Sequence, residues 1–336
     1  MNSFGRIFRV HIFGESHGEC IGITIDGCPA GLSLSADDFV TDIERRKPGA
    51  KGTTPRTEDD IPQLKTGVFN GKTTGAPITI LFENNNTRST DYEKQRAVPR
   101  PGHADFVASK KFGGNEDYRG SGHFSGRLTV CLVAAGVIAK RLLLTSSKGG
   151  GIIVQSAISE IGGETDLEKG LQKAIDAKDS IGGIVECKVT GLPIALGEPF
   201  FDSAESLISH AVFAIPAVRG IEFGTGFAAA KMFGSQHNDS IEDRSGKTFS
   251  NHAGGIVGGL TNSNELVFRI AIKPTSSTPK EQQTLNTETG NVENFSVKGR
   301  HDLCIALRVP VIVEAVTAIV LADLMLLEQK IPGIIS

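Results

Sequence analysis

Two long apolar segments constrain the fold of this 336-residue chain more than any other feature of its sequence. Residues 128–144 are apolar nearly all round and rich in good helix formers, and residues 314–329 show a second strongly apolar helical pattern. A helix that lacks a polar face is normally central and buried, so we expect both segments to form the core. Lys140 in the first segment and Asp323 in the second argue against a membrane span.

Apolar residues that alternate with polar ones predict strands around these helices. The alternation is clearest at residues 8–12 and 21–25, and strands are also expected at 78–82, 184–190 and 266–272. A period of two residues places every second side chain on the same face of a strand. The sequence therefore predicts strands that are buried on one face.

Two shorter helices and one sequence echo complete the outline. Helical patterns are expected at about residues 36–46 and 202–213. The run Pro-Ala-Gly-Leu at 29–32 precedes the first, and the similar run Pro-Ile-Ala-Leu at 193–196 precedes the second. This echo indicates a weak internal duplication. Because no linker separates two parts of the chain, we expect a single domain over residues 1–336.

The segment Gly14-Glu15-Ser16-His17-Gly18 lies between the first two predicted strands. Its Gly-x-Ser-x-Gly pattern also occurs at the nucleophile of serine hydrolases, where a strand leads through a sharp turn into a helix. Here the alternation after the motif predicts a strand, which favours a tight connection between two strands. We therefore expect a turn that presents Ser16 and His17, with a hydrolase that uses Ser16 as the minor alternative.

Charge and cysteine content narrow the class of protein. The net charge of -3 gives no global basic field that would attract nucleic acid. The five cysteines are widely spaced and contain no Cys-x-x-Cys pair, so neither a metal site nor a disulfide framework is expected. Scattered thiols fit a reducing cytosol, and the N-terminus lacks the apolar run of a signal peptide. These features predict a cytoplasmic protein without a metal, a membrane partner or a nucleic-acid partner.

Clusters of arginine, histidine and hydroxyl groups point to an anionic small molecule. Arg100 precedes His103 in one loop, and Ser125 can cap the first apolar helix beside Arg127. A helix start with a hydroxyl and an arginine suits a phosphate or a carboxylate. The run Lys-Pro-Thr-Ser-Ser at 273–277 offers a cation and three hydroxyls to a phosphate. Histidine exchanges protons near neutral pH, so the clusters suggest proton chemistry on a phosphorylated, carboxylated substrate.

Taken in order, these motifs resemble those of the chorismate synthase family. The resemblance covers nearly the whole chain, which makes it far more specific than any single motif. It rests on residues 14–18 with 23–29, on 122–136, on 300–314, and on the runs at 45–46, 100–105, 251–255 and 273–277.

The resemblance implies a lyase that converts 5-enolpyruvylshikimate 3-phosphate to chorismate and phosphate by a 1,4-elimination, the last step of the shikimate pathway to the aromatic amino acids. It implies a need for reduced FMN, although the overall reaction is redox-neutral. The insertions of members with their own flavin reductase are not evident, so an external flavin reductase or reductant is expected, with NADP as the associated nucleotide. The implied fold is α/β, a β-α-β sandwich with central helices between antiparallel sheets, and members are typically homotetramers.

The resemblance also assigns roles to individual residues. His17 would protonate near the leaving phosphate, His103 would act as a proton donor at the flavin, and Asp302 would lie near the flavin N5 and take part in proton abstraction. The substrate would be held by Ser16, Arg46, Ser125, Arg127 and Arg300. FMN would be bound by His123, Phe124, Ser125, Pro216, Ala217, Gly258, Lys273, Pro274, Thr275, Ser276, Ser277 and Arg300.

Three positions depart from the usual pattern of the family. His123 stands where many members have arginine, Leu303 stands where proline is usual, and Lys51-Gly52 occupies a loop that often carries arginine. The histidine would make the charge near the flavin dependent on pH. Besides the hydrolase, the alternative to the lyase is a non-catalytic flavin-binding protein. The presence of all three predicted catalytic residues favours the lyase.

Overall fold

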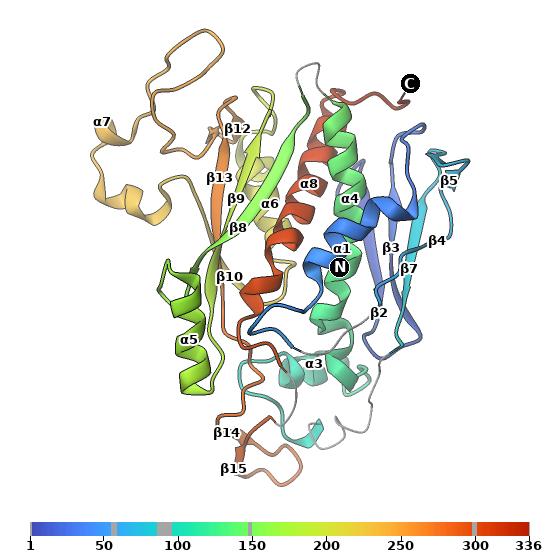
Figure 1. Ribbon diagram of the computed structural model, residues 1–336, viewed down its shortest axis with the longest axis vertical. Helices are drawn as coiled ribbons and strands as arrows, with labels where there is room; N and C mark the ends of the chain where they lie inside the picture. Colours follow the sequence, from blue (N-terminus) through green and yellow to red (C-terminus); the bar gives the residue numbers. More distant parts are fainter. Residues whose placement is uncertain (1, 55–58, 86–95, 147–149, 298–300, 336) are drawn as a thin grey trace.

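A pair of helices forms the centre of the fold. The computed structural model describes residues 2–54, 59–85, 96–146, 150–297 and 301–335. The central helices, α4 (Thr129–Thr145) and α8 (Pro310–Leu327), lie side by side between two sheets (Figure 1). Both predicted apolar helices are confirmed. The second begins earlier than expected, because Pro310 is well suited to the first turn of a helix.

The first sheet has five strands in the order β1-β2-β3-β7-β4. Their bounds are Ser3–Phe4 for β1, Arg9–Gly14 for β2, Cys20–Asp26 for β3, Ile78–Glu83 for β7 and Gln63–Leu64 for β4. All neighbours are antiparallel, and Ile23 of β3 pairs with Ile12 of β2 and Ile80 of β7. Ile21, Ile23 and Ile25 are fully buried, so the predicted alternation does place one face of this sheet in the core.

The second sheet has four antiparallel strands in the order β10-β13-β9-β8. Their bounds are Val218–Phe223 for β10, Leu266–Ile272 for β13, Gly183–Thr190 for β9 and Ile153–Ile161 for β8. Val185, Cys187 and Val189 of β9 are fully buried, and Cys187 Sγ lies 4.0 Å from Thr317 Oγ1 of α8. Two antiparallel sheets around central helices confirm the predicted α/β sandwich.

Shorter elements connect these layers. Both shorter helices are confirmed, as α1 (Val40–Arg46), which continues a 3-10 turn at Ala36–Phe39, and as α6 (Ala204–Val212). Further helices in the described part of the chain are α3 Asp105–Phe112, α5 Leu167–Ala177 and α7 Gly234–His237. Three hairpins pair β5 Val68–Phe69 with β6 Lys72–Thr73, β11 Ile256–Val257 with β12 Leu260–Thr261, and β14 Gln282–Leu285 with β15 Val292–Phe295.

The central helices approach closely because α4 has a glycine at their contact. A Cβ atom at Gly136 would lie 2.3 Å from the Cβ of Ala315 in α8, so a larger residue would push the helices apart. By length and composition, α8 and the segment Arg119–Thr145 that contains α4 could each cross a membrane. However, 89% and 78% of their apolar windows are buried inside the fold, so both helices serve as its core.

The charged residues of α8 are buried and bind several partners. Glu314 is 3% exposed and accepts hydrogen bonds from Arg45 of α1 at 2.7 Å and from Lys140 of α4 at 2.6 Å. It also accepts from the backbone N–H of Ser156 in β8 at 3.0 Å. Farther along α8, Asp323 accepts three backbone N–H bonds from residues 6–8, at 2.7 to 2.9 Å. These bonds fix which elements lie against α8.

The two halves of the chain repeat one order of strands. The first sheet contains four adjacent strands in the order β2-β3-β7-β4. The second sheet has the equivalent order β8-β9-β13-β10, in which the first, second, fourth and third strands of the unit follow one another. In the run 29–32, the Thr73 hydroxyl donates to Pro29 O at 2.6 Å and accepts from Leu32 N–H at 3.0 Å. In the run 193–196, the Thr261 hydroxyl likewise donates to Pro193 O at 2.6 Å and accepts from Leu196 N–H at 2.9 Å. We propose on this basis that the single domain arose by internal duplication.

Replacement of Glu314 by glutamine should lower the free energy of unfolding by about 1.5 to 3 kcal/mol at neutral pH, because the buried carboxylate loses its charged hydrogen bonds to Arg45 and Lys140. Burial alone would raise the pKa of Glu314, but Arg45 and Lys140 hold it below its ordinary value of 4.5. The charged carboxylate therefore stabilises the fold fully above pH 4.5. The difference between the two proteins should shrink as the pH falls through the lowered pKa.

Urea denaturation over a series of pH values measures this difference. Glu328→Gln, at the exposed end of α8, is the control and should change the free energy of unfolding by less than about 0.5 kcal/mol. A difference between wild type and Glu314→Gln that does not depend on pH would contradict the role of the buried charge.

Candidate active site

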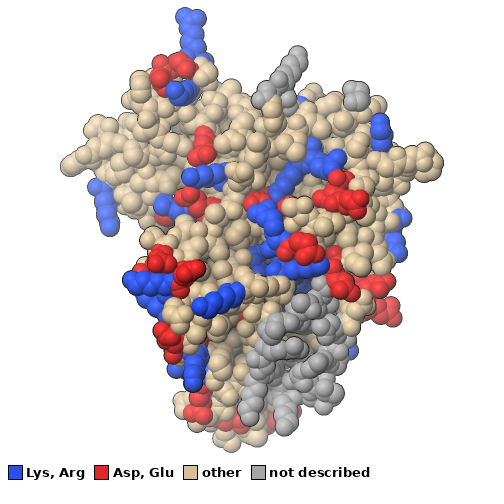
Figure 2. Space-filling view, in the orientation of Figure 1, with Lys and Arg blue, Asp and Glu red and all other residues tan. Residues whose placement is uncertain are grey.

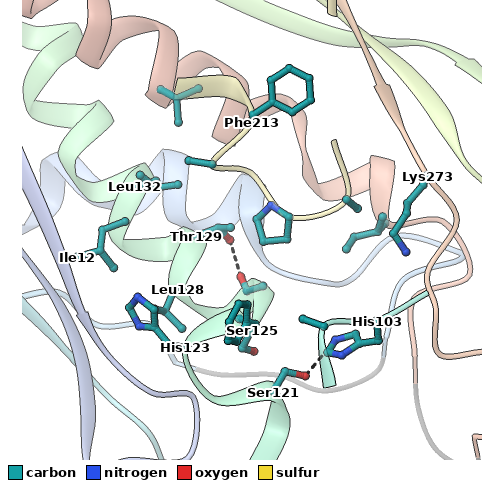
Figure 3. A pocket seen from close by; sticks show the side chains of 18 of the residues that line it. Ile12, His103, Ser121, His123, Ser125, Leu128, Thr129, Leu132, Phe213 and Lys273 are labelled. Atoms are coloured by element: carbon teal, nitrogen blue, oxygen red, sulfur yellow. Dashed lines mark hydrogen bonds between the residues drawn. The ribbon is translucent and has the colours of Figure 1, made fainter. Parts of the chain in front are cut away.

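A cavity of about 740 Å³ opens beside the first turn of α4. Apolar residues such as Ile12, Leu132 and Phe213 line one side, and His103 and Lys273 lie on the other (Figure 3). This size and this mixture of apolar wall and few polar groups are typical of sites for small molecules and cofactors. The described residues contain no group of three or more His, Cys, Asp or Glu side chains that could hold a metal ion.

The cavity brings together most of the residues predicted to bind FMN. They are His123, Phe124, Ser125, Pro216, Ala217, Lys273, Pro274, Thr275, Ser276 and Ser277. The structure places Gly258 elsewhere, in the turn between β11 and β12. Its left-handed φ of 63° favours glycine there without any ligand. Arg300 lies outside the described residues, so its contacts stay a prediction.

The segment after β13 forms a polar cradle at the cavity. Lys273 Nζ donates to Ser276 Oγ at 2.7 Å and to Gly102 O at 3.1 Å. Burial and the nearby charge of Arg219 lower the pKa of Lys273. The Thr275 hydroxyl is buried and has no hydrogen-bond partner in the described part of the chain. A buried hydroxyl without a partner close to a lysine fits a phosphate group.

His103 lies at the cavity wall in a network centred on Arg100. The buried Arg100 guanidinium donates to both oxygens of Asp105, at 2.7 and 2.8 Å. It also donates to the hydroxyls of Ser121 at 2.9 Å and Ser277 at 3.2 Å. His103 Nδ1 is 2.6 Å from Asp105 Oδ1, and Nε2 is 3.3 Å from Ser121 Oγ. Burial alone would raise the pKa of Asp105, but hydrogen bonds from Arg100 and His103 hold it well below its ordinary value.

Ser16 and His17 lie in the turn between β2 and β3, as predicted. Both are buried, and Ser16 Oγ lies 3.0 Å from His17 Nδ1 and donates to Gly120 O at 2.8 Å. The segment 119–122 thus contacts both histidines, because Gly120 packs against the His17 ring and the Ser121 hydroxyl lies within hydrogen-bond distance of His103. The turn leads into a strand, so it lacks the helix that a hydrolase nucleophile requires.

Arg46 and Arg127, two predicted substrate residues, meet at the start of α4. Arg46 Nη1 donates to Asp60 Oδ2 at 3.0 Å, and Arg127 Nη1 pairs with Asp60 Oδ1. All three side chains are buried. Burial and repulsion from Arg308 lower the pKa of Arg46 to about 10, which leaves it charged at neutral pH. Among the described side chains this cluster holds two cations and one carboxylate, which favours an anionic ligand.

Asp302, the third predicted catalytic residue, is not among the described residues that line the cavity. Its carboxylate accepts from Thr54 N–H at 2.8 Å and from Arg308 Nη1 at 3.3 Å. Arg308 Nε donates in turn to Arg46 O at 3.0 Å. The structure therefore links Asp302 to the arginine cluster, and places His17 against Gly120 and His103 against Ser121.

The positions that depart from the family pattern make specific contacts. Leu303 N–H donates to Gly52 O at 2.9 Å, a bond that proline at this position could not make. Gly52 has a φ of 91°, and a Cβ atom there would lie 2.6 Å from Leu171. His123 joins the cavity rim to the first sheet, with Nδ1 2.8 Å from Gly14 O.

Several residues that organise the site were missed by the sequence interpretation. Asp60 lies in a polar stretch without periodicity, and its partners Arg46 and Arg127 are 14 and 67 residues away. Arg308 and Ser121 were likewise given no role. Asp105 stands in the run 100–105, where an acid five residues after an arginine was the available signal.

Replacement of Gly120 by alanine should lower the free energy of unfolding by more than about 1 kcal/mol. Gly120 has a left-handed φ of 55°, and a Cβ atom would lie 2.1 Å from His17 Cε1. Thermal and urea denaturation measure the loss. Gly234→Ala at the start of α7 is the matched control, because no atom lies within 4 Å of its added Cβ. Equal stability of the two variants would contradict the close contact.

Comparisons with known proteins identify the family of this chain. A family model described as chorismate synthase matches residues 8–326. A chorismate synthase of Chitinophaga pinensis is 71% identical over 330 residues, covering 98% of each chain. One from Dehalococcoides mccartyi is 44% identical, covering 100% of this chain and 99% of the relative. A crystal structure of chorismate synthase matches with a TM-score of 0.72 at 25% identity, covering 97% of this chain and 93% of the other. The chain belongs to the chorismate synthase family.

Proposed function

We propose that the chain eliminates phosphate and a ring proton from 5-enolpyruvylshikimate 3-phosphate to give chorismate, with reduced FMN as cofactor, in the shikimate pathway. Family membership supports the reaction. The observation that carries the proposal for this chain is the cavity, in which segments far apart in sequence bring His103 together with the cradle of residues 273–277.

The residues around the cavity fit FMN. Lys273 and the hydroxyls of Thr275 and Ser276 would bind its phosphate, and the Thr275 hydroxyl, which has no partner among the described residues, would gain an acceptor there. Apolar side chains such as Ile12 and Leu132 would exclude water from the flat ring system. Reduced FMN would lend electron density transiently while phosphate leaves. His103 would supply a proton at the cavity wall, where Asp105 holds its ring.

The remaining predicted residues would act on the substrate. Ser16 lies within hydrogen-bond distance of His17 and would hold that ring as an acid near the leaving phosphate. The guanidinium groups of Arg46 and Arg127 would attract the substrate's anionic groups. Ser125, which caps the turn before α4, would bind beside them, and Asp302 would take part in proton abstraction.

Purified protein supplied with 5-enolpyruvylshikimate 3-phosphate and dithionite-reduced FMN should form chorismate. His17→Ala should slow turnover by about 10²- to 10⁴-fold, as expected when a positioned proton transfer is lost. His11→Ala is the control, because His11 is exposed on β2 and its Nδ1 contacts Ser3. Absence of turnover in a folded protein that binds FMN would favour the non-catalytic alternative, and fluorophosphonate labelling of Ser16 would favour the hydrolase.

A cytoplasmic location and an external supply of reduced flavin belong to the same proposal. All five cysteines are free thiols, which suits a reducing compartment. Burial raises the pKa of Cys28 and Cys131 to about 12, so these thiols are unreactive. An NADP-linked flavin reductase or another reductant would supply reduced FMN. Basic and acidic side chains are mixed on the face shown in Figure 2, which supports a small-molecule substrate in place of nucleic acid.

A homotetramer is the proposed assembly, and exposed phenylalanines support an interface. Phe227, Phe233 and Phe249 are 83%, 77% and 74% exposed. They belong to the segment around α7, which extends away from the second sheet in Figure 1. Exposed aromatic side chains gathered on one segment mark interaction surfaces.

Light scattering should report a tetramer for the wild type, and a smaller species when Phe227 and Phe233 are both replaced by serine, because the contact loses its aromatic area. Phe69→Ser is the control, since Phe69 is 71% exposed on the β5–β6 hairpin across the molecule (Figure 1). An unchanged mass in the double variant would rule out this surface.

A further inference from the structure

Ser121 has a backbone conformation that serine rarely adopts. Gly120, Ser121 and Gly122 have left-handed φ values of 55°, 72° and 50°. Glycine adopts such values without steric cost, whereas a residue with a Cβ atom is strained. Two of the three positions are glycine and the central one is not. The side chain of Ser121 therefore contributes a contact that offsets its strain.

The Ser121 hydroxyl contacts His103 at the wall of the cavity. Both residues line the cavity, and Oγ is 3.3 Å from His103 Nε2 (Figure 3). Oγ also accepts a hydrogen bond from Arg100 Nη2 at 2.9 Å. A guanidinium can only donate, so this bond occupies a lone pair of the oxygen and leaves the hydroxyl proton for His103.

Asp105 fixes which nitrogen of His103 carries the proton. His103 Nδ1 lies 2.6 Å from Asp105 Oδ1, and an ionised carboxylate only accepts, so Nδ1 is protonated. The two bonds from Arg100 to the carboxylate keep Asp105 ionised. Arg100 Nη2 also lies 3.1 Å from Nδ1, but two donors do not bond to each other. Nε2 is therefore an acceptor that faces the Ser121 hydroxyl.

We propose that Ser121 is a proton-relay residue between His103 and an acceptor bound in the cavity, and that Asp105 is the positioning residue of His103. This inference rests on the proposed function, in which His103 supplies a proton at the cavity. When His103 is protonated on both nitrogens, Asp105 stabilises its charge. Ser121 Oγ then gives its own proton to an acceptor in the cavity and takes the Nε2 proton of His103, which becomes neutral. The reverse transfers restore the starting state, and Ser121 gains no charge.

Nitrogen NMR of His103 in the protein without ligands tests the hydrogen-bond chain. In the wild type, Nδ1 should carry the proton and Nε2 should resonate as an acceptor. Asp105→Asn should give a mixture of the two tautomers. Asp117→Asn is the matched control, because Asp117 makes the same kind of two-bond pair but with Arg119 in place of Arg100. It should leave the His103 resonances unchanged. Ser121→Gly suits the left-handed backbone and should move the Nε2 resonance downfield, because the acceptor loses its donor.

Turnover is the second readout. Ser121→Gly should slow chorismate formation by about 10²-fold, the lower range for loss of a positioned proton transfer, without weakening FMN binding. Ser121→Cys keeps one donor and one acceptor and should recover part of the rate. Wild-type turnover in Ser121→Gly would overturn the relay, and an unchanged tautomer in Asp105→Asn would overturn the positioning role.

Two further outcomes separate the inference from its premise. Fluorophosphonate labelling of Ser121 would overturn the relay, because the Asp–His–Ser chain would then activate a nucleophile. A folded wild type that forms no chorismate would contradict the proposed function, and the NMR measurements would still decide whether Ser121 and Asp105 hold His103 as described.

Discussion

The close contact between α4 and α8 at Gly136 and Ala315 determines where the rest of the molecule lies. Both helices are apolar all round, so every side that does not face the other helix needs a cover, and the two antiparallel sheets supply it. Glu314 and Asp323 lie inside this core, where α1, α4, β8 and the segment before β2 donate hydrogen bonds to their carboxyl groups. Apolar burial thus drives the assembly, and these bonds fix which element lies where.

The candidate active site lies at the beginnings of the two central helices. Arg46 connects them, because its Nε donates to Thr129, the first residue of α4, and its carbonyl accepts from Arg308, just before α8. Ser125 and Arg127 directly precede α4. A shift of one helix against the other would therefore move the groups proposed to bind the substrate, so the geometry of the site depends on packing in the core.

Elements with a local, periodic signal were predictable from the sequence. The central helices and the strands around Ser16 and His17 are of this kind, and the segments that line the cavity were found through contiguous motifs. The network of Asp60 was not predictable, because it joins residues that only tertiary packing brings together. Gly258 shows a different limit: a glycine needed for a left-handed turn and one needed beside a ligand give the same sequence signal.

The direction of the central helices has an electrostatic consequence. In Figure 1, α4 and α8 run the same way, and both begin on the side that faces α3 and the β14–β15 hairpin, where Arg46 joins them. The peptide dipoles of a helix sum to about half an elementary positive charge at its N-terminus. The proposed duplication would thus have brought two such ends to one place. Their field does not titrate, so it attracts phosphate and carboxylate at every pH at which the fold persists.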